Sequence, residues 1–466
     1  MENRKIHLIS LTITALVLTS GCASVSPHDA YKEVEASLEE RGIESVYWYT
    51  GEEEDEEIEE KIDQLLEEEL TVNSAVQITL LNNRRLQAVY SQLGVAQADL
   101  VQAGLLSNPI FRGSLLLPVG SGSQELQLGI SQSFLEIFYI PLRKRVAKSM
   151  LEETKLVVTA SVLDFEYRAR TAFYQAQATA QRLEMFEQIT LATELGYEMA
   201  QRLQEAGNIN ELELHEHRDL YEQARINLRL VERDYLRARE GLNRVMGIFG
   251  EEIEWTMHRR LPMIPEEEVD LDMIESRVIE KSLDLALARQ RIITAGNLLG
   301  FQETTALFPV MRAGVGTENE AGNWRVGPTL ALPIPFFDQG QARIARSFSE
   351  LRIQQDNYIA LAIEIRSKTR EARENIGAAM QLSEHYQNII LPLRERITGE
   401  AQLQYNAMQI GVFELLRARE RQIEAGEGYV KFLLDYWTSR AMIDLLLKGR
   451  TPPHPFFLES HYADER

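Results

Sequence analysis

Apolar positions along much of this chain recur at steps of three and four residues, which is the period of a helix packed against another helix. One such seam keeps this step through Val158, Val162, Phe165, Ala169, Ala172, Ala176 and Thr179. It lies within 142–206, a stretch without proline that as one α-helix would reach roughly 100 Å. A second long helix is predicted over 341–410, where Phe348, Leu351, Tyr358, Leu361 and Ile365 keep a similar spacing.

Two shorter stretches change to a period of two, which is typical of strands with one apolar and one polar face. They predict one strand pair over 109–135 and a second over 309–336. Their apolar side chains alternate with small or polar ones. This apolar face comprises Leu126, Leu128, Ile130, Trp324, Val326, Leu330 and Leu332.

The order of these elements repeats along the chain. A first repeat over 71–250 is expected to hold a helix, the strand pair 109–135, the long helix 142–206 and a return helix, and after a linker over 251–270 a second repeat covers 271–450. It holds the same elements, with strands at 309–336 and the long helix at 341–410, before a tail over 451–466. Gly207 and Gly411, 204 residues apart, end the two long helices. The fold class is therefore mainly α with a small β part.

The N-terminus resembles a bacterial lipoprotein signal. Arg4 and Lys5 precede an apolar run too short to span a bilayer, and the run ends at Gly21-Cys22. We expect a signal peptide over 1–21, lipidation at Cys22, and a lipidated arm with an acidic segment over 22–70. Ala23, where an aspartate would favour the inner membrane, implies retention at the outer membrane.

Composition excludes several classes of function. A formal net charge of −22 repels phosphate backbones, so no nucleic-acid partner is expected. The sequence offers no nucleophile elbow, phosphate loop or cysteine cluster, and we expect no enzyme activity, cofactor or metal site. His215 and His217 lie two apart on a predicted helix and point away from each other, which disfavours a shared metal ligand role.

The strand pairs set a requirement for assembly. Strands with one apolar face suit the wall of a membrane barrel, with the apolar face named above toward lipid. Four strands cannot close a barrel, and open edges are not tolerated in lipid. Three copies would supply twelve strands around an aqueous lumen.

The ordered duplicate resembles the outer membrane efflux protein family typified by TolC, over roughly residues 70 to 450. The resemblance rests on Leu70-Thr71 followed by Ala75 and Asn82-Asn83, on Pro109 and Pro309 before the strands, on Pro335 to Gly340 before the second long helix, and on Glu213-Leu214 and Glu414-Leu415-Leu416 after the glycine turns. It implies a homotrimer with a 12-stranded outer membrane barrel and a periplasmic tunnel made of an antiparallel coiled-coil helical barrel. It also implies a periplasmic adaptor (membrane fusion) protein and an inner-membrane pump, here expected to be of the resistance-nodulation-division type.

By this resemblance Gly207 and Gly411 mark the periplasmic tip where the adaptor docks, although any helical hairpin also needs such a residue. Glu414 matches an acidic residue of the closed aperture, while Arg417 stands where a second acid is often found. We hypothesise that Glu414 and Arg417 pair within or between protomers and latch the tip.

The leading function is thus a passive export duct for metal ions or drugs. A type I protein secretion duct remains open as an alternative. A lipid-anchored periplasmic coiled-coil scaffold is another, but it would leave the apolar face of Trp324, Leu330, Leu332 and Ile334 exposed without a reason.

Overall fold

The computed structural model describes residues 26, 28–51, 54–120, 124–266, 270–307, 310–320 and 322–452. The chain divides into two compact units. One comprises the described parts of Met1–Val34, Ser91–Lys155 and Arg289–Asp356, and the other comprises Glu35–Tyr90, Leu156–Ala288 and Asn357–Arg466. Long helices such as α6 and α10 contribute residues to both units.

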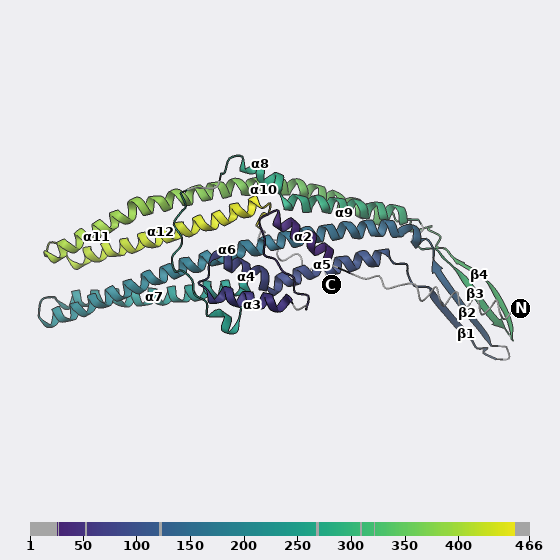
Figure 1. Cartoon of the computed structure of the whole chain (residues 1–466), viewed down its shortest axis with the longest axis horizontal. Coiled ribbons are helices and arrows are strands. Elements are labelled where there is room, and N and C mark those ends of the chain that lie inside the picture. The colour runs from purple at the N-terminus through teal and green to yellow at the C-terminus, as the bar shows by residue number, and fades with distance from the viewer. Residues whose placement is uncertain are drawn as a thin grey trace. The chain divides into compact units, whose positions relative to one another are not determined.

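The elements follow the order that the sequence predicts, and the mainly helical fold with a small β part is confirmed (Figure 1). After α2 (His28–Glu39) and α3 (Glu54–Glu67), the first set is α4 (Val72–Asn82), α5 (Arg84–Gly104), β1 (Ile110–Leu116), β2 (Glu125–Ser133), α6 (Glu136–Glu205) and α7 (Glu211–Met246). A 3-10 turn, η1 (Gly250–Ile253), leads to α8 (Ile274–Lys281), α9 (Leu283–Thr305), β3 (Arg312–Glu320), β4 (Asn323–Ala331), α10 (Gln341–His385), the π-helix η2 (Tyr386–Ile390), α11 (Leu391–Asn406) and α12 (Val412–Leu447).

Three predicted stretches differ from the structure. The N-terminal arm, expected to be extended, forms helix α2, because Tyr31, Val34 and Leu38 fall on one helical face and are buried. Helix α6 begins at Glu136 rather than 142 and includes Pro141, whose missing N–H removes only one hydrogen bond near the helix start.

The second long helix is not continuous. A π-turn, η2, separates α10 from α11 just before Pro392, which cannot donate a backbone hydrogen bond. The ring of Tyr386 in this turn lies against Gly428 of α12, where an added Cβ would approach Tyr386 Cε1 to 2.6 Å. The ring of Tyr386 and the backbone of Gly428 therefore pack directly against each other, although they are far apart in sequence.

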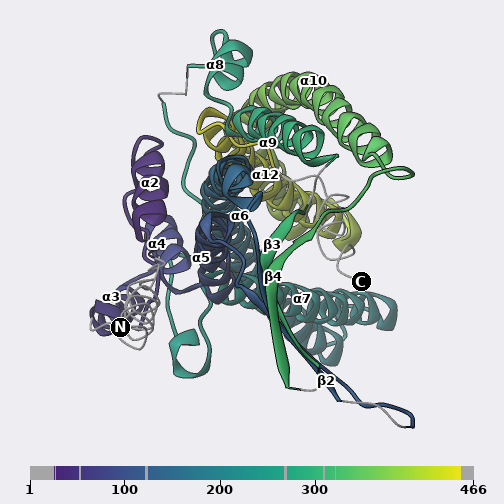
Figure 2. The ribbon, with the colours of Figure 1, turned by 90° about the vertical axis from the view of Figure 1, so that its right-hand side faces the viewer.

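The four strands form one antiparallel sheet in the order β1-β2-β3-β4 (Figures 1 and 2). The two predicted strand pairs are joined directly through β2 and β3, where Gly129 lies opposite Gly316 and Ile130 opposite Val315. Strands β1 and β4 are the edges of this sheet.

The helical cores form where the predicted seams lie. Val158, Val162, Ala169 and Ala176 of the α6 seam are fully buried. In the second seam Ile365 is fully buried and Tyr358 and Leu361 pack against the same cluster, but Phe348 is 55% exposed. The α10 seam is thus buried within a single chain only in its later part.

The Asn82-Asn83 motif closes a joint between helices. Asn83 Nδ2 donates to the carbonyl of Val245 at the end of α7 (2.7 Å), and its Oδ1 accepts from the amides of Arg85 and Leu86 at the start of α5. Asn82 Nδ2 donates to the carbonyl of Gly247 (3.1 Å). One dipeptide therefore satisfies open backbone groups at two helix ends.

Candidate functional site

The sheet has the two faces that the alternation predicts. Directly paired residues of antiparallel strands share a face, and Phe111, Ile130 and Val315 form one such row. Leu128, Thr317 and Val326 form the next row, with Asn319 beside Trp324 and Ala313 beside Leu330. On β4, Trp324, Val326 and Leu330 are 56%, 70% and 68% exposed.

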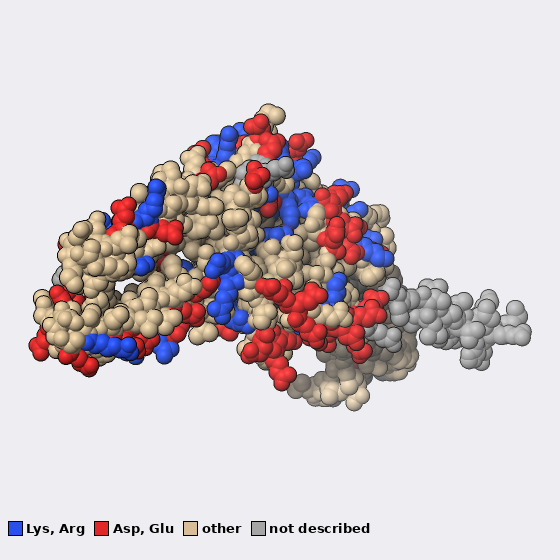
Figure 3. Space-filling view, turned by 60° about the vertical axis from the view of Figure 1, so that its left-hand side comes forward, with Lys and Arg blue, Asp and Glu red and all other residues tan. Residues whose placement is uncertain are grey.

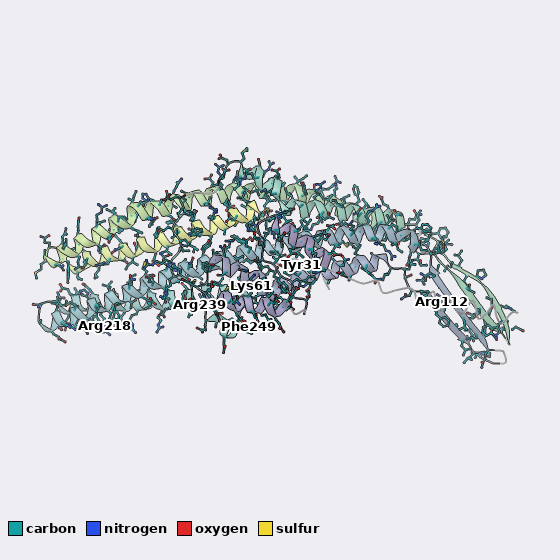
Figure 4. All side chains as sticks on the ribbon, viewed as in Figure 1. Tyr31, Lys61, Arg112, Arg218, Arg239 and Phe249 are labelled. Atoms are coloured by element: carbon teal, nitrogen blue, oxygen red, sulfur yellow. The ribbon has the colours of Figure 1, made fainter. Side chains whose placement is uncertain are left out.

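The opposite face of the sheet carries mainly small and polar residues, with Ile110 and Leu116 of β1 as apolar exceptions. Arg112 of β1 (labelled in Figure 4) pairs with Gly129 and so lies on this face. Gln127 pairs with Glu318, which in turn pairs with Arg325. Glycines fill its middle at 129, 314, 316 and 327. A sheet with one apolar face and one polar face of low bulk is suited to separating lipid from water.

Gly314 is required by close packing rather than by an unusual backbone angle. A Cβ placed there would lie 2.1 Å from the carbonyl oxygen of Ile130 and 2.8 Å from Cα of Ser131. The approach of β3 to β2 at this point therefore excludes every other residue, a constraint that the sequence alternation did not reveal.

The first helical hairpin, between α6 and α7, turns at Gly207. Its φ of 72° is left-handed, and the amide of Asn208 donates to the carbonyl of Leu203 (2.8 Å), a standard helix ending with glycine. Asn210 then caps the start of α7, its side chain accepting from the amide of Glu213. Arg218 lies further along α7 (Figure 4).

The second hairpin, between α11 and α12, uses a different residue for the same turn. Met408 has the left-handed φ of 58°, and the amide of Gln409 donates to the carbonyl of Gln404 (2.9 Å). Gly411 instead lies directly before α12, at its N-cap, with an ordinary φ of −79°. Matching the turns pairs Gly207 with Met408 and Asn210 with Gly411, so the two glycines of the prediction hold different positions.

Glu414 and Arg417 both lie exposed in the first turns of α12. Glu414 is the counterpart of Glu213 when the two turns are matched. Within the described part of one chain, no ion pair involves either Glu414 or Arg417. The intramolecular form of the latch is therefore not formed, and pairing between protomers stays a prediction.

His215 and His217 do not form a metal site with their neighbours, and no group of three potential metal ligands occurs among the described residues. His217 is half-buried near Gly196 of α6, and burial lowers its pKa although the charge of Glu213 opposes the shift. Its environment is that of a packed histidine kept neutral.

The acidic segment contributes to packing through one side of α3. Ile62 is buried, with Ile58, Leu65 and Leu66 packed around the same core cluster. Its carboxylates face solvent, and Figure 3 shows acidic side chains in larger patches than basic ones on the visible face. From Glu54 onward, the charge run is a solvated helix face.

Several predicted features lie outside the described residues, namely the signal segment, Cys22, Pro309 and the tail from Pro453 onward. Among the described helices, none is long and apolar enough to cross a bilayer.

The fold is similar to those of known proteins. No family model matches the chain. The cobalt-zinc-cadmium resistance protein CzcC of Cupriavidus metallidurans is 21% identical over 397 residues, which are 81% of this chain and 90% of the relative. The Campylobacter jejuni CmeC outer membrane channel is 16% identical with a TM-score of 0.65, covering 82% of this chain and 87% of that one. The open-state Neisseria gonorrhoeae MtrE outer membrane channel is 16% identical with a TM-score of 0.61, covering 82% and 90%.

The chain has the fold of the outer membrane efflux channels. The resemblance to the TolC family is confirmed for the fold. On this fold the two-faced sheet and the two helical hairpins are the candidate functional features.

Sequence reasoning missed Met408 and Gly314. Aligning the two turns by Ala206 and Ala407, rather than by the glycines, would have revealed Met408 as the counterpart of Gly207. Nothing in the alternation distinguishes Gly314 from its neighbours, because its constraint comes from β2.

Proposed function

We propose that this chain is the outer membrane channel of a tripartite efflux system. It assembles as a homotrimer, is anchored by lipid on Cys22, and forms a passive duct for metal ions or drugs. A periplasmic adaptor and an inner-membrane pump, here of the resistance-nodulation-division type, supply the cargo and the energy, and the chain itself performs no chemistry.

The observation that carries this proposal is the four-stranded sheet with one apolar face and two open edges. In lipid, every backbone N–H and C=O needs a partner, so β1 and β4 of one chain must pair with strands of other chains. Three chains give twelve strands, which enclose a lumen lined by the face of Arg112, Gln127 and Arg325. The scaffold alternative gives no reason for an exposed apolar face on this sheet.

The helical hairpins supply the periplasmic end of the duct. We assign adaptor docking to the turns at Gly207 and Gly411, both exposed and each joining two long helices. The name of the relative CzcC supports cobalt, zinc and cadmium ions as the first cargo to test.

Purification and reconstitution test the proposal. The full chain should be extracted from outer membranes as a detergent-soluble trimer by native mass spectrometry, and should give discrete conductance steps in planar lipid bilayers. A deletion strain should become sensitive to zinc, cobalt or cadmium, or to drugs, and recover with the intact gene. A water-soluble monomer without conductance would overturn the channel and favour the scaffold.

The interprotomer latch gives a separate prediction. Replacing Glu414→Ala together with Arg417→Ala should raise single-channel conductance, because an ion pair across the aperture no longer holds the hairpins together. Glu211→Ala with Arg218→Ala, which removes one charge of each sign from the first hairpin, is the control. Conductance equal to that of the wild type in the Glu414 and Arg417 double variant rules the latch out.

A further inference from the structure

A pocket lies in the first unit, where the long helices meet the strands. It has a volume of about 330 Å³ and is lined by the start of α6, the end of α9 and the start of α10. The lining side chains are Glu136, Tyr139, Arg143, Phe301, Gln302, Thr305 and Arg343. Neither the predicted duct nor the hairpin tips make use of it.

The pocket is cationic. Arg143 and Arg343 occupy equivalent positions of the two repeats, 200 residues apart. The lining carboxylate, Glu136, accepts from the amide and the hydroxyl of Ser107 at 3.0 and 2.9 Å and keeps its negative charge. One of the two positive charges of Arg143 and Arg343 is therefore left uncompensated within the lining. Among the described residues, Arg343 enters no ion pair, so the pocket retains positive charge.

Not all hydrogen-bond donors of the Arg143 guanidinium have a partner. Its Nη2 donates to the carbonyl of Leu105 (3.1 Å), but its Nε is buried and has no hydrogen-bond partner. A buried donor without a hydrogen-bond partner costs free energy, and an acceptor placed beside it would recover that cost. Guanidinium groups bind phosphate oxygens with paired hydrogen bonds, which makes a phosphate group the fitting occupant.

Bulky apolar side chains accompany the pocket in both repeats. Ile137 precedes Arg143 by six residues and Phe337 precedes Arg343 by six, and each has an apolar neighbour, Phe138 or Phe336. All four of these apolar side chains are exposed. Apolar and aromatic residues followed by basic ones match the order of acyl chains and headgroups at a membrane surface.

We propose that this pocket binds the phosphate group of a phospholipid from the inner leaflet of the membrane. Arg143 and Arg343 clasp the phosphate, and the exposed apolar residues contact its acyl chains. This inference rests on the proposed function, because the strands must span the membrane for the pocket to lie at the level of the headgroups.

Lipid titration of the delipidated, detergent-purified full chain tests this inference by native mass spectrometry. Dioleoylphosphatidylglycerol should bind at least about tenfold more tightly than dioleoylglycerol, which has the same acyl chains but no phosphate. Arg143→Gln with Arg343→Gln should lose that preference. Lys148→Gln with Arg346→Gln removes the same charge from exposed positions of the same two helices and should retain it.

Several results would overturn the lipid site. They are wild-type affinity in the Arg143 and Arg343 double variant, equal loss in the control, or equal binding of dioleoylglycerol. Full displacement of the lipid by equimolar sodium phosphate would identify a free-anion site instead. If the double variant does not fold, Arg343→Gln alone, at an exposed position, should still weaken lipid binding severalfold, and an unchanged affinity would refute the site.

Bilayer conductance separates this inference from the channel itself. Normal conductance of the wild type without a lipid preference defeats only the lipid site. Absence of conductance in the wild type defeats the proposed function.

Discussion

Glycine meets three different requirements in this chain. At Gly207 it supplies the left-handed backbone of a helix end, at Gly411 it lies directly before a helix with an ordinary angle, and at Gly314 it permits contact between strands. Met408 takes the left-handed role in the second hairpin, although a side chain there is strained by roughly 1–2 kcal/mol. The structural role of a glycine therefore cannot be inferred from the sequence alone.

The close contact at Gly314 yields a sharp prediction. Gly314→Ala should abolish trimer assembly, because its Cβ would overlap the carbonyl of Ile130 in the neighbouring strand. Gly327→Ala, also on the polar face but with nothing within 4 Å of an added Cβ, should assemble normally. Native mass spectrometry of detergent extracts measures both, and normal trimers of Gly314→Ala would contradict the observed strand packing.

His217 predicts a pH dependence for the first hairpin. Burial lowers its pKa in the folded state below the ordinary value of about 6.5, so the unfolded hairpin binds a proton more readily. Stability is therefore complete above that ordinary value and falls as pH drops through it toward the lowered folded pKa. Hydrogen-exchange protection factors at the start of α7 should fall as the pH drops below about 6.5, and His217→Gln should flatten this change. An equal fall in both proteins would exclude His217 as the cause.

At the scale of elements, the helix ends of the second unit are closed by contacts from distant segments. Asn83 serves the end of α7 and the start of α5, and Ser282 caps α9 while the amide of Leu283 donates to the carbonyl of Gly449 after α12 (2.7 Å). Beyond Gly449, Arg450 binds Asp164 of α6 (2.7 Å) and Asp284 of α9. In the first repeat, these contacts join the return helix α7 to α4 and α5. In the second repeat, they join the return helix α12 to α8 and α9.

Asn83 provides the test at this scale. Asn83→Ala should destabilise the protein by about 2 kcal/mol, since it leaves the carbonyl of Val245 and the amides of Arg85 and Leu86 without their partner. The apparent thermal unfolding midpoint of the detergent-solubilised protein measures the loss. Asn73→Ala, at the exposed start of α4, serves as the control. Equal unfolding midpoints for the two variants would contradict the stabilisation of two helix ends by Asn83.

For the whole molecule, the decisive feature is the incomplete sheet of a single chain. Its apolar face and open edges fit the proposed assembly with other chains in lipid, and its small, polar face suits water. The long helices alone would be compatible with a scaffold.

Val326 and Gly327 are neighbours on β4 with opposite orientations, so substitutions there test which face of the sheet contacts lipid and which contacts water. Val326→Arg faces the proposed lipid and should reduce barrel stability by about 2–4 kcal/mol if it lies near the bilayer midplane. Gly327→Arg lies at the same depth on the opposite face, where an added Cβ meets open space, and should change conductance while leaving assembly intact. Folding yield into dioleoylphosphatidylcholine vesicles and bilayer conductance measure the two effects. Equal folding yields would refute the assignment of the faces.

Three features follow from the sequence alone, namely the duplicated order of elements, the helical seams and the two faces of the strands. Each of these depends on the period with which side chains repeat along a helix or strand, and that period can be read locally. The alternation of Leu126, Leu128 and Ile130 thus predicted their common face.

Other features are visible only in the folded chain. They are the pairing of β2 with β3, the close contact at Gly314, the left-handed turn at Met408, and the pocket that Arg143 and Arg343 share. Each of these depends on a contact or backbone angle set by the packing of segments distant in sequence. The α10 helix likewise ends in a π-turn where Tyr386 meets Gly428. Local periodicity carries no information about such partners, because the same pattern is compatible with several arrangements in space.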